Sequence, residues 1–224
     1  MSKLIIVESP AKAKTIKSFL ERGYDVIASK GHIRDLPQRT LGIDIDGDTF
    51  TPKYEIVSDH KDVVKTIKEK AKSADKIYLA TDEDREGEAI AFHIAEAIGK
   101  DPLSLPRIVF HEITKTAINA ALKSPRALDM ASVNAQKARR LLDRIVGYKL
   151  SPLLSQKIQK GLSAGRVQSA ALKIIVDKER EIKAFVPQKY FSIECVFAKD
   201  LEAEIYAFKG KKLERLQDET GFCQ

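Results

Sequence analysis

Hydrophobic positions follow two patterns in the first half of the chain. Short apolar runs, typical of buried strands, alternate with segments whose apolar residues recur every three or four positions, as in amphipathic helices. The expected strands are LIIVE (residues 4–8), YDVIAS (24–29), KIYLAT (76–81) and RIVFHEI (107–113). The expected helices are AKAKTIKSFL (11–20), HKDVVKTIKEKA (60–71) and GEAIAFHIAEAI (87–98). This alternation predicts an α/β fold with a parallel sheet flanked by helices.

The pattern changes near residue 114, where strands give way to helices. The expected helices are TKTAINAALK (114–123), VNAQKARRLLDRIVGYKL (133–150) and GRVQSAALKIIVDKEREI (165–182), with breaks at Ser124-Pro125, Ser151-Pro152, Gly161 and Gly165. Two alternating segments, KYFSIECVFA (189–198) and LEAEIYAFKG (201–210), predict paired strands. A lone hairpin is only marginally stable. We therefore expect an α/β domain over 1–113, a mainly helical domain over 114–188, and the beginning of an incomplete β-rich domain over 189–224.

Composition and charge indicate the kind of partner and the cellular compartment to expect. The 224 residues, 43% of them hydrophobic, are enough to bury a sizeable core. A net charge of +7 indicates an acidic partner, most commonly nucleic acid, although solubility alone would also explain it. The two cysteines form no CxxC pair, so we expect neither disulfides nor zinc. No apolar run reaches the length of a membrane span and no signal peptide is evident, so we expect a cytoplasmic protein that binds no membrane.

The segment ATDEDREGEA (80–89) places five carboxylates within seven positions, directly after an expected strand. Ligands bind at the carboxyl ends of strands in open parallel sheets. Asp82, Asp84 and Glu86 could therefore converge on one hard cation, for which Mg²⁺ is the natural choice. The alternative is that acids in a first helical turn only complement the helix dipole.

The segment ESPAKAKT (8–15) gives a second indication of chemistry. Ser9 as N-cap and Pro10 at the first helical position predict a helix start. Lys12 and Lys14 follow, where the helix dipole disfavours cations unless an anion is bound. A phosphate would resolve this conflict, with Glu8 joining the carboxylates. Two solvated lysines on an exposed face are the alternative.

The helix over 133–150 carries clustered arginines beside its apolar stripe. Arg140 and Arg144 repel each other at i,i+4 unless something anionic lies between them. Asp143 could be that group, paired with Arg139 or Arg140 in an ordinary salt-bridged face. A strand of phosphates is the functional interpretation.

The segment SAGRVQS (163–169) combines small residues with a charge at a helix start. Ser163 and Gly165 would let a sugar-phosphate backbone approach the backbone N–H groups, while Arg166 supplies charge beside Gln168. A capped surface helix is the alternative.

Five motifs together resemble a known family. IVESPAKAKTI, GHIRDLP (31–37) and ATDEDREGEAIA resemble the N-terminal Toprim domain of type IA DNA topoisomerases. NAQKARRLLDRIVGY and GLSAGRVQSAAL resemble the helical domain that follows it. The acidic motif alone would indicate only the wider Toprim class, which includes bacterial primases and small nucleases. The resemblance covers essentially the whole chain and implies a Rossmann-like Toprim sheet.

The resemblance also implies roles for matching residues. Glu8 lies beside the nucleophile and is linked to proton transfer, and Lys12 contacts the scissile phosphate. The magnesium ligands would be Asp82, Asp84 and Glu86, with Glu8 as a further possible ligand. The expected DNA-binding residues are His32, Arg139, Arg140, Asp143, Arg144, Ser163, Gly165, Arg166 and Gln168.

The expected nucleophile of this family does not occur in the chain. The resemblance implies a tyrosine in a later domain, with an arginine two residues beyond it. None of the six tyrosines has arginine at that offset, and Tyr78 and Tyr148 fit packing positions. The family's strand-gate domain and zinc ribbons are also not found. We therefore interpret the chain as the front portion of a longer enzyme, without its nucleophilic tyrosine.

The function implied is part of an ATP-independent topoisomerase that relaxes negatively supercoiled DNA by transient single-strand cleavage, strand passage and religation. The expected cofactor is Mg²⁺; no GxxxxGK[ST] loop for ATP occurs. We expect a monomer that acts on single-stranded or negatively supercoiled DNA at the nucleoid. A related module occurs in reverse gyrase, and the sequence does not distinguish the two.

Two alternatives stay open. A stand-alone Toprim nuclease or primase-like protein could use two metals or a metal-bound water instead of tyrosine. A non-catalytic clamp could bind single strands, and with 7% aromatic residues and no Trp its binding would depend on phosphates and salt.

Overall fold

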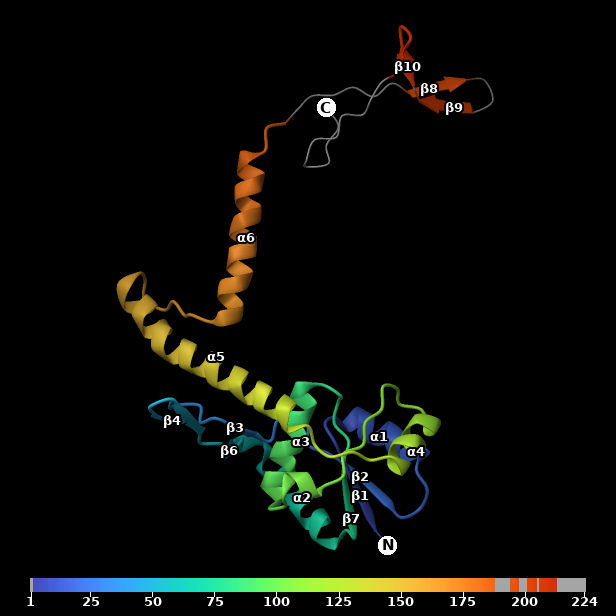
Figure 1. Cartoon of the computed structure of the whole chain (residues 1–224), viewed down its shortest axis with the longest axis vertical. Coiled ribbons are helices and arrows are strands. Elements are labelled where there is room, and N and C mark those ends of the chain that lie inside the picture. The colour runs from blue at the N-terminus through green and yellow to red at the C-terminus, as the bar shows by residue number, and fades with distance from the viewer. Residues whose placement is uncertain (1, 188–193, 198–200, 205, 213–224) are drawn as a thin grey trace. The chain divides into compact units, whose positions relative to one another are not determined.

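The computed structural model describes residues 2–187, 194–197, 201–204 and 206–212. The chain divides into two compact units, Met1–Gln168 and Ser169–Gln224, which we describe separately. The first unit contains a parallel sheet of β1 (Lys3–Val7), β2 (Tyr24–Ala28) and β7 (Lys76–Leu79) in the order β2-β1-β7 (Figure 1). The predicted parallel sheet is thus confirmed at three of its four expected strands.

Helices cover both faces of this sheet, as an α/β fold requires. On one face lie α2 (Lys61–Ser73) and α3 (Arg85–Ile98), and on the other lie α1 (Pro10–Phe19) and α4 (Lys115–Lys123). The chain also forms α5 (Met130–Lys157), α6 (Arg166–Ala184) and short 3₁₀ turns at Ser58–His60 and Pro102–Ser104. Side chains alternate along a strand, so β1 serves two cores. Leu4 and Ile6 pack in one cluster, and Ile5 and Val7 in the other.

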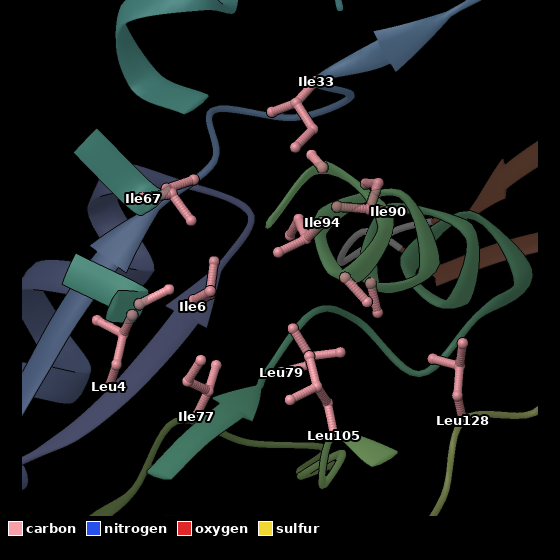
Figure 2. Packing of buried hydrophobic residues seen from close by; sticks show 14 of the residues in the cluster. Leu4, Ile6, Ile33, Ile67, Ile77, Leu79, Ile90, Ile94, Leu105 and Leu128 are labelled. Atoms are coloured by element: carbon pink, nitrogen blue, oxygen red, sulfur yellow. The ribbon is translucent and has the colours of Figure 1, made fainter. Parts of the chain in front are cut away.

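Isoleucine and leucine side chains form the larger of the two cores. Strand residues Leu4, Ile6, Ile77 and Leu79 lie there together with Ile67 from α2 and Ile90 and Ile94 from α3 (Figure 2). The smaller cluster packs Ile16 of α1 and Ile118 of α4 on the opposite side of β1. The two clusters fix the carboxyl ends of β1 and β7 next to each other.

Short strands between β2 and α2 were not predicted. They are β3 (Arg34–Asp35), which pairs antiparallel with β6 (Glu55–Ile56), and β4 (Ile43–Asp46), which pairs antiparallel with β5 (Thr49–Pro52). Gly47 takes a positive φ of 55° in the β4–β5 turn, the conformation that favours glycine. Ile45 and Phe50 are about half exposed, so the hairpin lacks the buried face that marks a strand.

Two predictions about the chain after β7 were wrong. Residues 107–113 form no strand: Arg107 makes only isolated bridges to Leu79 and Arg126, and the apolar Ile108 is buried without a ladder. Pro152 does not end a helix, because α5 continues through it to Lys157. Proline removes one backbone donor, a loss that the rest of a 28-residue helix tolerates.

The described residues of the second unit form most of α6 and four short strands. β8 (Glu194–Phe197) pairs antiparallel with β9 (Leu201–Glu204), which confirms the predicted pairing for these residues. β10 (Ala207–Phe208) pairs instead with β11 (Lys211–Lys212). The remainder of the two segments, and most of the predicted third domain, lie outside the described residues. Among those residues no helix combines the length and apolar content that a membrane span needs.

The buried position of Ile6 predicts a large loss on truncation. Ile6→Ala removes a fully buried side chain from the larger cluster. We expect the free energy of unfolding in urea to fall by about 3 kcal/mol. Ile175→Ala is the control, because Ile175 on α6 is 64% exposed and should change stability by less than about 0.5 kcal/mol. Equal losses for the two variants would contradict the assignment of the core.

Candidate active site

The carboxyl ends of β1 and β7 bring the ESPAKAKT and DEDREGE segments together. Ser9 caps α1 by accepting a hydrogen bond from Lys12 N at 3.3 Å, as the sequence predicted. Asp84 caps α3, and its Oδ1 accepts from Gly87 N at 2.7 Å. Asp82 lies in the loop between β7 and α3. Two helix N-termini and one acidic loop therefore meet at the same edge of the sheet.

Lys12 joins the two segments directly. Its Nζ donates hydrogen bonds to Glu8 Oε1 and to Asp82 Oδ1. These two carboxylates balance the lysine charge near the N-terminus of α1, so the predicted conflict with the helix dipole is relieved inside the protein. Lys14 has no such contact among the described residues and is exposed, as in the alternative of a solvated lysine.

The same surroundings shift the pKa values of the two carboxylates in opposite directions. Burial, helped by the neighbouring charge of Asp82, raises the pKa of Glu8 above its ordinary value. Hydrogen bonding to Glu8 and to Lys12 lowers the pKa of Asp82. Burial alone would lower the pKa of Lys12, but the hydrogen bonds to Asp82 and Glu8 raise it. Of the two carboxylates, Glu8 therefore takes up a proton more readily than Asp82.

The three predicted magnesium ligands have different partners. Asp82 contacts Lys12, Asp84 caps α3, and Glu86 Oε2 accepts from Gln136 Nε2 at 3.1 Å and lies 3.5 Å from His32 Nε2. Within the described ranges, no three His, Cys, Asp or Glu side chains are gathered as a ready metal-binding set. Glu8 and Asp82 nevertheless lie close enough together to share the ammonium group of Lys12. Mg²⁺ is commonly bound by one or two carboxylates together with substrate phosphates. The donor chemistry of these residues therefore fits Mg²⁺.

A polar cavity of about 300 Å³ lies beside Glu86. The residues that line it include His32, Glu86, His93, Gln136, Arg139 and Arg140. His93 is buried in its floor, and its Nδ1 has no hydrogen bond in the described part of the chain. Burial, with the nearby charges of Arg34 and His32, lowers the pKa of His93 to about 4, so the ring is neutral at pH 7. Nothing in the sequence pattern singles out His93 beyond its place on an apolar helical stripe.

The arginines of α5 make contacts that the sequence did not predict. Arg140 Nε donates to Asp35 Oδ1 at 2.9 Å, and Arg144 Nη1 donates to the carbonyl oxygens of Pro37 at 2.7 Å and Thr40 at 3.1 Å. The predicted repulsion between Arg140 and Arg144 is thus relieved by other parts of the protein. Arg139 is exposed and forms no ion pair with any described residue.

Asp143 pairs with Arg166 and not with Arg139 or Arg140, the partners that the alternative interpretation offered. Arg166 Nε donates to Asp143 Oδ1 at 2.8 Å, and this hydrogen bond lowers the pKa of Asp143. Arg140 instead binds Asp35, because α5 packs against residues 34–40. Ala164 N donates to Ser151 Oγ at 3.0 Å, which holds the start of α6 against α5. Ser163 and Gln168 are exposed on this start, next to Gly165.

A buried network of charged side chains holds the acidic loop in place, and the sequence pattern did not predict it. Arg107 is fully buried and donates from Nε to Glu88 Oε1 at 2.9 Å. Its Nη1 and Nη2 donate to the carbonyl oxygens of Thr81 at 2.8 Å and Asp82 at 2.6 Å. Gly87 completes the arrangement, because a Cβ there would overlap the Asp82 carbonyl oxygen.

Glu88 connects this loop to the start of α5. Its Oε1 also accepts from Arg126 Nη2 at 2.6 Å, and its Oε2 accepts from the backbone N of Asp129, the N-cap of α5, at 3.0 Å. Burial alone would raise the pKa of Glu88, but hydrogen bonds from Arg126 and Asp129 and the charge of Arg107 hold it below its ordinary value. One carboxylate therefore links the acidic loop, residue 126 and α5.

Comparison with known proteins agrees over nearly the whole chain. Residues 3–113 match the Toprim domain family, and residues 127–222 match the DNA topoisomerase family. The chain is 71% identical to DNA topoisomerase 1 of Campylobacter jejuni over 213 residues, which are 95% of this chain and 30% of that protein. It is 63% identical to DNA topoisomerase 1 of Helicobacter pylori, again over 95% of this chain and 29% of that protein.

Among solved structures, full-length topoisomerase I of Thermotoga maritima superposes with a TM-score of 0.78 at 51% identity. The match covers 94% of this chain and 36% of that one. The chain thus spans about 30% of the length of the curated relatives it matches.

The Glu88 network predicts a pH-dependent stability effect. Glu88→Gln should lower the free energy of unfolding by about 3 kcal/mol at pH 7, because Arg107 loses its buried partner charge. The folded pKa of Glu88 lies below 4.5, so its contribution is complete above pH 4.5 and is lost as the pH falls through the lower folded value. Urea unfolding from pH 7 to pH 3 should show the gap to the unaltered chain narrowing below pH 4.5.

The matched control is Glu179→Gln, which alters an exposed carboxylate of α6. It should change stability by less than about 0.5 kcal/mol at every pH. A gap for Glu88→Gln that stays constant down to pH 3 would show that the carboxylate charge is not what stabilises this network.

Proposed function

Because the chain belongs to the DNA topoisomerase family and contains its Toprim domain, we propose that it holds the metal and the scissile phosphate of an ATP-independent type IA enzyme. The reaction is the relaxation of negatively supercoiled DNA by transient single-strand cleavage, strand passage and religation. One observation carries the proposal: Lys12 is held by Glu8 and Asp82 where two helix N-termini meet an acidic loop. We further propose action on single-stranded or negatively supercoiled DNA, in the cytoplasm, as a monomer.

Glu8 and Lys12 are the proposed catalytic residues of this part. The raised pKa of Glu8 suits a group that passes a proton to or from an oxygen on the phosphate. An ammonium group has three donors, and two of those on Lys12 go to Glu8 and Asp82. The third is available to a phosphate oxygen. The two carboxylates therefore orient the Lys12 ammonium group and leave one of its N–H groups to donate to the substrate.

Asp82, Asp84 and Glu86, together with Glu8, are the residues that would hold Mg²⁺. When bound, magnesium supplies positive charge that stabilises charge developing on the phosphate oxygens. Asp84 and Glu86 each use one carboxylate oxygen in the hydrogen bonds described above. Their second oxygens form no hydrogen bond with other described residues, which leaves them available to a cation.

The DNA-binding role is best supported for the exposed side chains. Arg139, unpaired and at the rim of the polar cavity with His32, is placed to contact a phosphate. Arg166 and Asp143 lie at the surface with Ser163 and Gln168 at the start of α6. Arg140 is tied to Asp35 and must share its charge with that carboxylate. For Arg144 we propose instead that it positions residues 36–40 through their carbonyl groups.

The nucleophilic tyrosine is proposed to come from outside this chain. Tyr78 is 4% exposed inside β7, and the Tyr148 hydroxyl donates to Gln38 O at 3.1 Å while Arg144 lies over its ring. Tyr54 packs edge-on against His93 with ring centroids 4.5 Å apart. Each of these rings has a packing role, and none lies beside Lys12.

We retain the predicted division into a Toprim domain over 1–113, a helical domain over 114–188 and a β-rich beginning over 189–224 as part of this proposal.

A covalent-adduct assay tests this division of labour. The chain is mixed with end-labelled single-stranded DNA and Mg²⁺, quenched in denaturant and examined for DNA attached to protein. We expect binding without adduct or cleavage, because the nucleophile is missing. An adduct would place the nucleophile among the chain's own tyrosines. Cleavage without an adduct would favour a hydrolytic Toprim nuclease.

Removal of Arg139 tests the proposed path of the single strand. Arg139→Ala should weaken binding of a single-stranded oligonucleotide and flatten the slope of log K against log salt by about 0.7, the value for one lost phosphate contact. Arg22→Ala is the control, because Arg22 is exposed just before β2, at the opposite end of that strand from the acidic loop. Identical slopes for the two variants would remove Arg139 from the proposed path.

A further inference from the structure

Helix α2 carries a row of lysines that no part of the proposed site uses. Lys61, Lys65, Lys68 and Lys72 are all exposed and follow each other at helical spacings of four, three and four positions. They lie beside the buried face of α2, which consists of Val64, Ile67 and Ala71. At about 1.5 Å per residue the row is about 16 Å long. We call these four residues the lysine stripe.

The lysine stripe forms no ion pair within the part of the chain that the structure describes. None of its four side chains forms an ion pair or hydrogen bond with a described residue, whereas Lys70 of the same helix pairs with Asp25. Like charges at i,i+3 and i,i+4 destabilise a helix. Two carboxylates lie near the stripe: Glu96 is bound to Arg34, and Glu69 of α2 lines the same hollow without an ion pair to a described residue. The stripe therefore accounts for four positive charges of a chain whose net charge is +7.

Two hollows run along the lysine stripe. One, of about 710 Å³, lies between α2 and the end of α3, and its lining includes Lys68, Lys72, Lys100 and one carboxylate, Glu96. The other, of about 450 Å³, follows α2, and its lining includes the four lysines of the stripe and one carboxylate, Glu69. Neither hollow is lined by an aromatic residue, so neither offers a surface on which unpaired bases could stack.

The lysine stripe also lies apart from the acidic loop. Lys100 follows the C-terminal end of α3, and the acidic loop precedes its N-terminal end. A helix of 14 residues is about 21 Å long, so the hollow at Lys100 and the Asp84 cap are separated by one helix length. A ligand at the stripe would not occupy the Lys12 site.

We propose that the lysine stripe binds the phosphate backbone of a DNA duplex, as a second DNA surface separate from the acidic loop. The inference rests on the proposed function only in taking DNA as the substrate. Each strand of a duplex carries one phosphate per 3.4 Å of helix axis, so a straight row of about 16 Å faces about five phosphates. Backbone contacts alone hold a duplex without reading its sequence. The absence of aromatic lining residues favours a duplex over a single strand.

A charge-removal variant of the whole chain tests the proposal. K61Q/K65Q/K68Q/K72Q should bind a 24-bp duplex about tenfold more weakly at 0.1 M salt, with the salt slope flatter by about 3.6, or 0.9 for each lost phosphate contact. Its affinity for a 24-nucleotide single strand should stay unchanged, because that strand is proposed to bind elsewhere. The matched lysine-to-arginine variant at the same four positions should keep duplex binding.

The second control is K17Q/K53Q/K178Q/K183Q, which removes the same charge from lysines that pair with carboxylates. If it weakens duplex binding equally, net charge and not the stripe is responsible, and the proposal fails. Competition by poly-glutamate as effective as by duplex would assign the stripe to acidic polypeptides and also overturn it. If the unaltered chain binds single strands but no duplex, only this inference fails. If it binds neither, the DNA-binding part of the proposed function fails as well.

Discussion

The buried ion pair between Arg107 and Glu88 is the constraint on which the arrangement of the site depends. A charge removed from water is costly unless its partners satisfy it fully. Arg107 meets this condition by donating to Glu88 and to the carbonyl groups of Thr81 and Asp82, and Glu88 does so by accepting also from Arg126 and the backbone of Asp129. The cost is thus offset only when the acidic loop and the start of α5 are both in place. The loop that presents Asp82 is thus held through its backbone carbonyl groups by Arg107, in addition to the contacts of its own side chains.

This arrangement explains how a basic chain tolerates five carboxylates in seven positions. Glu88 belongs to the buried network, Asp84 caps α3, and Asp82 shares Lys12 with Glu8. Glu86 accepts from Gln136, and Glu83 lies beside His111. Each of the five acids has a separate partner, so repulsion among them is limited before any metal binds. The arrangement also leaves the groups unequal, with Glu8 raised and Asp82 lowered in pKa. Unequal carboxylates can divide proton transfer and cation binding between them.

The sequence predicted what depends on local periodicity and failed where partners lie far apart along the chain. Strands β1, β2 and β7 and the helices follow from apolar spacing, and the cap Ser9 from residue type. The cap Asp84 was not predicted. The pair Asp143–Arg166 was missed because helix spacing favoured partners one turn away. Arg107 was read as part of a strand because its neighbours are apolar, although its charge is satisfied by Glu88, 19 positions earlier. Short strands such as β3 and β6 depend on tertiary contacts that no local pattern records.

Positive charge is distributed unevenly between two kinds of side chain. Several arginines near the site are paired with carboxylates, among them Arg107, Arg140 and Arg166. Their guanidinium groups hold loops and helix ends in position. The lysines of α2 have no such partners among the described residues, so their charge remains available to solvent and ligands. Unpaired charge at a surface sets the long-range field, while paired charge contributes little beyond a Debye length. The field that attracts a polyanion therefore comes mainly from groups outside the site, and the groups inside it orient the phosphate that arrives.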